Sequence, residues 1–401
     1  MQIFHDPSKQ INFLSQILSN GKKSLSFFIS AGCPLGVTMP AGAWPLIPAI
    51  KELSQKVNTH FAEPANIPLR YQDLLQELNA DGLDHENIEQ VLSFIRALSH
   101  VAGKGLVRGF SRGNLADIEK VICEKIVELI NVSLPNSDTP YHQLSAWIAS
   151  IDREQPIDIF TTNYDLLIEQ ALEESLIPYF DGFVGSRNSF FDLKALEDNQ
   201  IPKHWTRLWK IHGSLNWYKS GAKIHRSTGI KPDAINSPLI YPSYLKYDQS
   251  RKMPYLALLD HLTRSVRNES NVLITSGYSF NDDHINDAML NALVANPSSM
   301  IIALLYGELN AYPNAISLAK SRPNIGLWAL DEAIIGTKRG KWSVTKYNSE
   351  DNIANVIQIE DIPDPIDPTK TLKILKLQLG DFKHLGNFLH HLVIQDNQLS
   401  K

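Results

Sequence analysis

Four short clusters of small and polar residues carry the side chains best suited to chemistry, and each directly follows a short apolar run. The clusters read SAGCPLG (30–36), TNYD (162–165), HGSLN (212–216) and GYSFNDD (277–283). Together they supply an amide, an imidazole, carboxylates, hydroxyls and glycines, the groups from which polar ligand sites are built. In open parallel sheets, ligands bind where the carboxyl ends of the strands meet. We therefore expect the four clusters to form one shared site.

Three of these side chains are suited to a reacting centre. His212 carries an imidazole, which acts as a general base near neutral pH. Asn163 offers a donor and an acceptor together, and so can fix a water molecule or a hydroxyl group. Asp165 either stabilises developing positive charge or caps the helix that follows it.

The first cluster allows two interpretations of equal weight. Ala31 and Gly32 let backbone N–H groups approach a phosphate group at a helix N-terminus, or they only make a tight packing turn. The cluster is neither GxGxxG nor a P-loop, so the usual dehydrogenase and phosphate-loop fingerprints are missing. For Cys33 we favour a small side chain facing the ligand loop over a reactive thiol.

The elements that must position these clusters alternate between short apolar runs and amphipathic helical patterns. This alternation predicts an α/β fold with a Rossmann-like parallel sheet. The expected strands are Leu25–Ile29, Ile157–Thr161, Leu208–Ile211, Val272–Thr275, Met300–Tyr306 and Gly326–Leu330.

Two regions depart from this alternation. Residues from about 60 to 140 predict a helical insertion, with helices over Leu69–Asn79, Glu86–Val101 and Leu115–Val132. Residues 331–401 predict a small C-terminal appendage for assembly or partner contact, beyond a core domain of residues 1–330. In the appendage we expect a basic turn at Lys338–Lys341 and a linker at Asp361–Pro368. Beyond the linker we expect a strand at Leu372–Leu379 and a helix at Phe382–Val393. The polar stretch Asp181–Lys203 predicts a loop or small excursion beside the site.

Composition narrows the function classes. The formal net charge is −5, so nothing indicates nucleic acid as a direct partner. Cys33 and Cys123 are the only cysteines, too few for a disulfide framework or a four-cysteine zinc site, and they favour a reducing cytoplasm. We find no signal peptide and no apolar stretch long enough to span a membrane. The DDH cluster of Asp282, Asp283 and His284 lacks complementary ligands, so we interpret it as part of a solvated helix, with Asn281 or Asp282 as the N-cap, rather than as a metal site.

The order and spacing of the four clusters resemble the sirtuin family of NAD-dependent enzymes. Asn163 and Asp165 match the Asn and Asp of its TQNID segment, and Leu167 and Ala171 match the helix that follows. The other matches are the HG pair at His212–Gly213 and the late G-x-S loop at Gly277–Ser279. The resemblance implies that NAD is the ligand, held by the residues Ala31, Gly32, Cys33, Thr162, Gly277 and Ser279.

The departures from the sirtuin pattern are also informative. Ser30 replaces the first glycine of the GAG loop, and Thr162 replaces a glutamine expected to touch the nicotinamide ribose. The paired CxxC zinc module of the protein deacylases is absent. In these departures the chain resembles the sirtuin-like NAD hydrolases of bacterial anti-phage systems. Its layout is most similar to the sirtuin-like subunit that pairs with a HerA-type hexameric ATPase, which implies a homo-oligomer within a larger assembly.

The resemblance and the residues together predict an NAD hydrolase, with NAD as substrate and no zinc. Asn163, His212 and Asp165 are the expected catalytic residues. Cyclisation or base exchange of NAD stays open, because sequence does not reveal water access to the site. The main alternative is a nucleotide-sensing subunit that gates a partner ATPase or nuclease. A deacylase with a new peptide site is a third alternative, disfavoured by the missing zinc module.

Overall fold

A ten-stranded sheet forms the centre of the molecule. The computed structural model describes these residues: 3–63, 68, 70–198, 201–220, 223–228, 254–268, 270–344, 353–363 and 371–399. Across the sheet the strands run in the order β1 (Phe4–His5), β14 (Lys338–Trp342), β13 (Glu332–Ile335), β12 (Ile325–Trp328), β11 (Met300–Leu304), β10 (Val272–Ser276), β2 (Leu25–Ile29), β3 (Asp158–Thr161), β7 (Thr206–Lys210) and β4 (Tyr179–Phe180).

The seven strands from β12 to β4 are parallel to their neighbours, and all six strands expected from the sequence lie among them. Their residues are buried on both faces because helices cover both. Phe27 and Ile29 of β2 belong to one apolar cluster, and Phe28 belongs to the other. The first face is covered by α1 (Pro7–Leu18), α6 (Pro140–Ser150), α7 (Leu167–Glu174) and α13 (Phe382–Leu399). The second face is covered by α10 (Tyr255–Arg267), α11 (Asp283–Ala295) and α12 (Pro313–Ser321). The α/β Rossmann-like fold is thereby confirmed.

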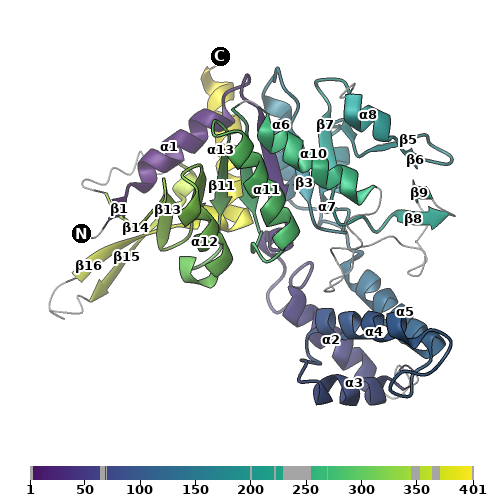
Figure 1. Cartoon of the computed structure of the whole chain (residues 1–401). Coiled ribbons are helices and arrows are strands. Elements are labelled where there is room, and N and C mark those ends of the chain that lie inside the picture. Colours follow the sequence, from purple (N-terminus) through teal and green to yellow (C-terminus); the bar gives the residue numbers. More distant parts are fainter. Residues whose placement is uncertain are drawn as a thin grey trace.

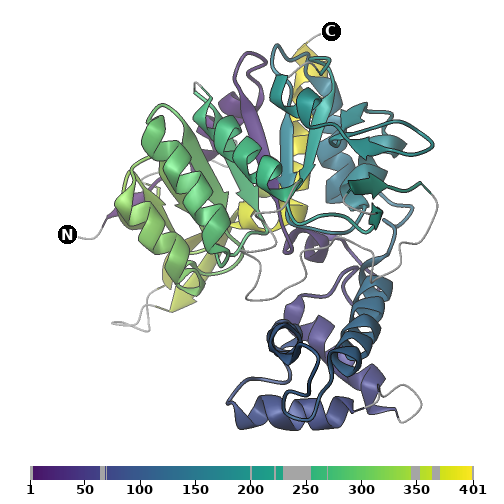
Figure 2. The ribbon, with the colours of Figure 1, turned by 45° about the vertical axis from the view of Figure 1, so that its right-hand side comes forward.

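The helical insertion forms a separate lobe beyond the carboxyl ends of the central strands (Figures 1 and 2). Its helices are α2 (Ile50–Ala62), α3 (Tyr71–Ala80), α4 (Ile88–Ala102) and α5 (Arg112–Ile130). The three helices expected from the sequence are confirmed, and α2, which begins before residue 60, packs with them. The side chains of Asn87 and Ser111 cap α4 and α5. The lobe buries its own apolar cluster.

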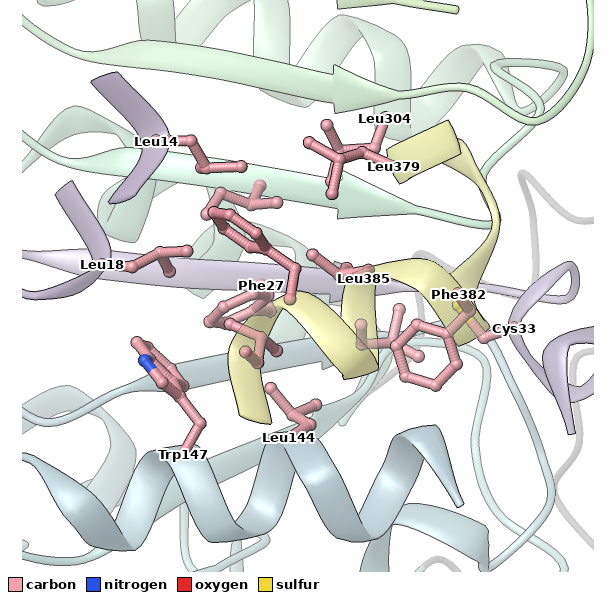
Figure 3. Packing of buried hydrophobic residues seen from close by; sticks show 14 of the residues in the cluster. Leu14, Leu18, Phe27, Cys33, Leu144, Trp147, Leu304, Leu379, Phe382 and Leu385 are labelled. Carbon is pink, nitrogen blue, oxygen red and sulfur yellow. The ribbon is translucent and has the colours of Figure 1, made fainter. Parts of the chain in front are cut away.

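The chain after residue 330 differs from the peripheral appendage that we expected. Strands β13 and β14 extend the central sheet, so Lys338–Lys341 lies in a strand rather than in a turn. Helix α13 packs on β2 and α6, where Phe382 and Leu385 contact the cluster around Phe27 and Trp147 (Figure 3). The physical reason is the apolar face of α13, whose side chains at Phe382, Leu385, Phe388, Leu389 and Leu392 are buried in the main core. Any role of residues 331–401 in assembly stays a prediction.

Smaller elements complete the fold. The expected strand at Leu372–Leu379 is β16 (Thr371–Leu377), which pairs with β15 (Ile357–Pro363) in a hairpin. Only the first three residues of the linker expected at Asp361–Pro368 are described, and they lie in β15. The excursion at Asp181–Lys203 holds β5 (Phe183–Val184), β6 (Phe190–Phe191) and α8 (Leu193–Asp198), and a hairpin of β8 (Trp217–Ser220) and β9 (Lys223–Arg226) follows β7. Within the described ranges, no helix is both long and apolar enough to cross a membrane.

Candidate active site

A cleft of about 640 Å³ lies between the carboxyl ends of the central strands and the helical lobe. Of the residues expected at the site, it is lined by Ala31, Gly32, Thr162, His212, Gly277 and Ser279. The four sequence clusters therefore meet in one place, as the parallel strand order predicts.

His212 directly follows β7 and is paired with a carboxylate that lies far from it in sequence. Its Nε2 lies 3.4 Å from Oδ2 of Asp282, and both side chains are nearly buried. The other oxygen of Asp282, Oδ1, accepts the backbone N–H of Ile285 and caps α11. One carboxylate thus fixes a helix start and faces the imidazole at once. The helix-start interpretation of Asp282 is confirmed, whereas its contact with His212 was not foreseen.

Two residues of the TNYD cluster line the cleft and two do not. Thr162 lines the cleft, and its hydroxyl lies 2.7 Å from the hydroxyl of Ser30. Asn163 is buried, is not among the lining residues, and donates from Nδ2 to the backbone carbonyl of Ser30 at 3.3 Å. Asn163 therefore holds the first loop in place, instead of reaching into the cleft as we expected. Tyr164 lines the cleft, and its ring lies 6.5 Å from the imidazole of His212.

Asp165 and Cys33 lie away from the cleft lining. Asp165 is buried, and its Oδ1 accepts the backbone N–H of Leu167, the first residue of α7; the N-cap position itself is Leu166, so Asp165 contacts the helix start from one residue before the cap. Cys33 is fully buried in the main apolar cluster and donates from Sγ to the carbonyl of Ser276, so its small side chain packs beneath the loop at Gly277 without lining the cleft itself. Burial raises the pKa of the Cys33 thiol to about 12, which keeps it protonated at neutral pH.

The glycines of the first and last clusters serve the contact between two loops. The N–H of Gly32 donates to the carbonyl of Gly277 at 3.0 Å, so this N–H is not directed at a phosphate group. A Cβ on Gly32 would lie 2.8 Å from the Cα of Gly277, and a Cβ on Gly277 would lie 2.6 Å from the nitrogen of Cys33. Gly277 also has a positive φ of 68°. For these two positions the packing interpretation explains the glycine.

A buried lysine, Lys210, donates hydrogen bonds to the backbone of the TNYD cluster. Nζ of Lys210 donates to Oε1 of Glu169 at 2.8 Å and to the backbone carbonyls of Tyr164 and Asp165. The lysine side chain is only 2% exposed. An ion pair with this much burial holds its neighbours in one geometry, because separating the charges leaves one of them unpaired.

The helical lobe and the C-terminal region add lining residues that sequence reasoning missed. Glu89 comes from the first turn of α4, and Asp381 from the residue before α13. With Asp282 they give the cleft three carboxylates, and its described lining holds no lysine or arginine. No local sequence motif marks Glu89 or Asp381 as a cleft residue, because each reaches the cleft only through the packing of its helix.

The tryptophans at 205, 209 and 217 pack in or against the second apolar cluster. Trp209 and Trp217 are fully buried in the second apolar cluster, and Trp209 Nε1 donates to Asp158. Among the described residues, no group of three or more His, Cys, Asp and Glu side chains is arranged to hold a metal ion.

Residues 158–322 match the family model described as a SIR2-like domain. The matched segment begins at β3 and contains Asn163, His212, Gly277 and Asp282, whereas the first loop and the helical lobe lie outside it. The match supports a sirtuin-like, NAD-related activity for the site. No curated protein matches the chain.

Proposed function

We propose that the protein hydrolyses NAD at the nicotinamide–ribose bond and releases nicotinamide and ADP-ribose. The observation that carries the proposal is the pair of His212 and Asp282, both in the SIR2-like segment, in a cleft to which that segment contributes nearly half of the lining residues.

The cleft suits NAD in size, and its carboxylates suit the cationic nicotinamide end of the molecule. Its volume of about 640 Å³ lies in the range of small-molecule and cofactor sites, roughly 300–1,000 Å³. The nicotinamide ring of NAD is cationic, and breaking its bond to ribose transfers positive charge to the sugar. Carboxylates at Glu89, Asp282 and Asp381 provide a negative field for a cation in the cleft.

In the proposed reaction the bond between C1′ of the ribose and the nicotinamide nitrogen breaks, and nicotinamide leaves as a neutral molecule with the electron pair. Water attacks C1′ while the imidazole of His212 accepts its proton at Nδ1, the ring nitrogen that does not face Asp282. Asp282 stabilises the imidazolium that forms, since its Oδ2 lies 3.4 Å from Nε2. The net reaction converts NAD and water to nicotinamide, ADP-ribose and a proton.

The neighbouring residues position the reacting groups. Asn163 holds the carbonyl of Ser30, and the paired hydroxyls of Ser30 and Thr162 lie at the lining, where they suit hydrogen bonds to ribose hydroxyls. Lys210 fixes the backbone of Tyr164, whose ring lies against His212. We assign Asn163 and Lys210 as positioning residues rather than catalytic residues.

Incubating the purified protein with NAD and separating the products by chromatography tests the proposal. We expect nicotinamide and ADP-ribose in equal amounts, and a decrease in rate of at least about a hundredfold for His212→Ala. His390→Ala is the matched control, because His390 is exposed on α13 and does not line the cleft. An undiminished rate for His212→Ala would contradict the assignment. Tight NAD binding without turnover by the full-length protein would instead favour the nucleotide-sensing alternative.

We further propose, from the resemblance alone, that the hydrolase acts in antiviral defence within an oligomer that includes a HerA-type ATPase. Continuous loss of NAD would harm a cell, so we expect the assembly to restrain the activity. Co-purification with an ATPase and light scattering of the complex test this proposal, and a fully active monomer in healthy cells would argue against it.

A further inference from the structure

A second cavity, of about 280 Å³, adjoins the cleft beside the carboxyl end of β11. We call it the hairpin cavity, because Gln358 of β15 and Lys376 of β16 line it. Tyr306, Gly380 and Asp381 line both the hairpin cavity and the cleft, so the two hollows meet at these residues. The proposed bond cleavage does not use the hairpin cavity.

The sheet places the hairpin cavity at a distance from the reacting pair. His212 follows β7, whereas Tyr306 follows β11. Four strand spacings separate these strands, in the order β11, β10, β2, β3 and β7. Neighbouring strands lie about 4.8 Å apart, so the strand ends are separated by about 19 Å. This span exceeds one nucleoside and suits a dinucleotide. A ligand with its nicotinamide at His212 therefore extends its second nucleoside toward Tyr306.

The charge of the lining changes along this span. Glu89 and Asp282 line the cleft, and the described lining of the cleft holds no lysine or arginine. The hairpin cavity, in contrast, is lined by Lys376 and His384. Lys376 pairs with Glu360 of the neighbouring strand, which holds the ammonium group in place. A lysine ammonium group is a compact cation that suits phosphate oxygens, so this end of the span favours the pyrophosphate of a dinucleotide.

Two glutamine side chains offer a donor and an acceptor side by side in the hairpin cavity. Nε2 of Gln378 donates to Oε1 of Gln358 at 2.9 Å. This bond orients both amides, and Oε1 of Gln378 can still accept while Nε2 of Gln358 can still donate. Adenine presents an amino donor next to a ring-nitrogen acceptor, the edge that amide side chains recognise in nucleic acids. The two amides therefore complement the edge of an adenine ring.

The junction of the two cavities offers an aromatic ring and a carboxylate. Tyr306 is 68% exposed, and its backbone carbonyl accepts from the hydroxyl of Tyr312 at 2.8 Å. An exposed aromatic ring beside a polar groove is a platform on which a base can stack. Asp381 lies at the same junction, and a carboxylate in this place suits the hydroxyls of a ribose.

We propose that the hairpin cavity binds the adenine of NAD, with the base stacked on Tyr306 and its amino edge on the amides of Gln358 and Gln378. Lys376 faces the pyrophosphate, and Asp381 accepts a hydroxyl of the adenosine ribose. This inference rests on the proposed NAD chemistry and deepens it, because it gives the substrate one direction in the cleft. It also assigns substrate contacts to the C-terminal region, outside the SIR2-like segment.

Titration calorimetry of the full-length protein with ADP-ribose tests the adenine site without any turnover of NAD. The comparison ligand is IDP-ribose, in which hypoxanthine presents a carbonyl oxygen where adenine has its amino group. We expect one ADP-ribose to bind per chain and IDP-ribose to bind about tenfold more weakly. Gln378→Leu should weaken ADP-ribose binding about tenfold and should remove the difference between the two ligands. A merely structural role of Gln378 would leave that difference in place.

Two further variants test the stacking and the charge. Tyr306→Ala should weaken ADP-ribose binding about tenfold, and Tyr306→Phe, which keeps the ring, should weaken it far less. Lys376→Ala should weaken it about fivefold and reduce its salt dependence. Lys373→Ala is the matched control, because Lys373 is an exposed residue of β16 that lines neither cavity. Its affinity for ADP-ribose should equal that of the unmodified protein, and circular dichroism checks that each variant is folded.

The outcomes separate the adenine site from the hydrolase. No ADP-ribose binding at millimolar concentration, or equal binding of ADP-ribose and IDP-ribose, would overturn the adenine site even if the protein hydrolyses NAD. An affinity that Tyr306→Ala and Gln378→Leu leave unchanged would overturn it as well. Adenine-selective binding that these variants abolish, in a protein that does not turn over NAD, would support the site and contradict the hydrolase.

Discussion

At the scale of single residues, the pair of His212 and Asp282 is the centre of the site. The pair depends on the two oxygens of Asp282 doing different things, since Oδ1 caps α11 and Oδ2 faces the imidazole. Sequence reasoning identified His212 by its chemistry and Asp282 by its capping position. It could not join them, because their contact depends on the relative placement of β7 and α11 and on the side-chain rotamers.

Replacing Asp282 with asparagine separates these two roles. Asparagine caps helices about as well as aspartate, so we expect a melting temperature within about 2 °C of the unmodified protein. The charge that stabilises the imidazolium is lost, so we expect NAD turnover to fall about ten- to a hundredfold, less than for His212→Ala. Steady-state kinetics and thermal unfolding measure the two effects. A large loss of stability with unchanged turnover would show that Asp282 serves only the helix.

At the scale of the elements, the buried parallel strands were the most predictable part of the fold. Each is a short apolar run between turn residues, and burial on both faces leaves little room for another interpretation. The expected strand Leu25–Ile29 agrees with β2 at both ends. The strand ends also predicted which loops meet in the cleft. They did not predict which side chains line it: Asn163 and Cys33 donate to the carbonyls of Ser30 and Ser276 and are not among the lining residues.

The contact between the first loop and the last loop gives a prediction at this scale. In Gly277→Ala the new Cβ meets the backbone of Cys33, and the residue keeps a positive φ. Gly336→Ala is the control, because Gly336 also has a positive φ but no atom within 4 Å of the added Cβ. The control should lose about 1–2 kcal/mol from backbone strain alone. Gly277→Ala should lose more and should also lose NAD binding, measured by denaturant unfolding and calorimetry. Equal losses of stability in both variants would show that the loop contact is not tight.

At the scale of the whole molecule, the C-terminal helix packs against elements that are far from it in sequence, including β2 and α6. The amphipathic pattern predicted a helix at Phe382–Val393, and α13 confirms it. The pattern does not show which surface the apolar face covers. That surface is the face of the main sheet beside α6 (Figure 3). The residue before α13, Asp381, lines the cleft. The core and one wall of the cleft therefore depend on residues near the end of the chain.

Truncation of one core side chain in α13 should consequently destabilise the entire molecule. Leu385 is fully buried against the cluster around Phe27, so Leu385→Ala should lower the free energy of unfolding by about 2–5 kcal/mol. Ile394 on the same helix is 42% exposed, so Ile394→Ala should change it by less than about 1 kcal/mol. We also expect a fragment of residues 1–330 to lack cooperative unfolding, because it exposes the apolar surface that α13, β13 and β14 cover. Thermal unfolding followed by circular dichroism measures all three proteins. A fragment 1–330 with a sharp transition near that of the intact chain would show that the main sheet folds without its C-terminal helix.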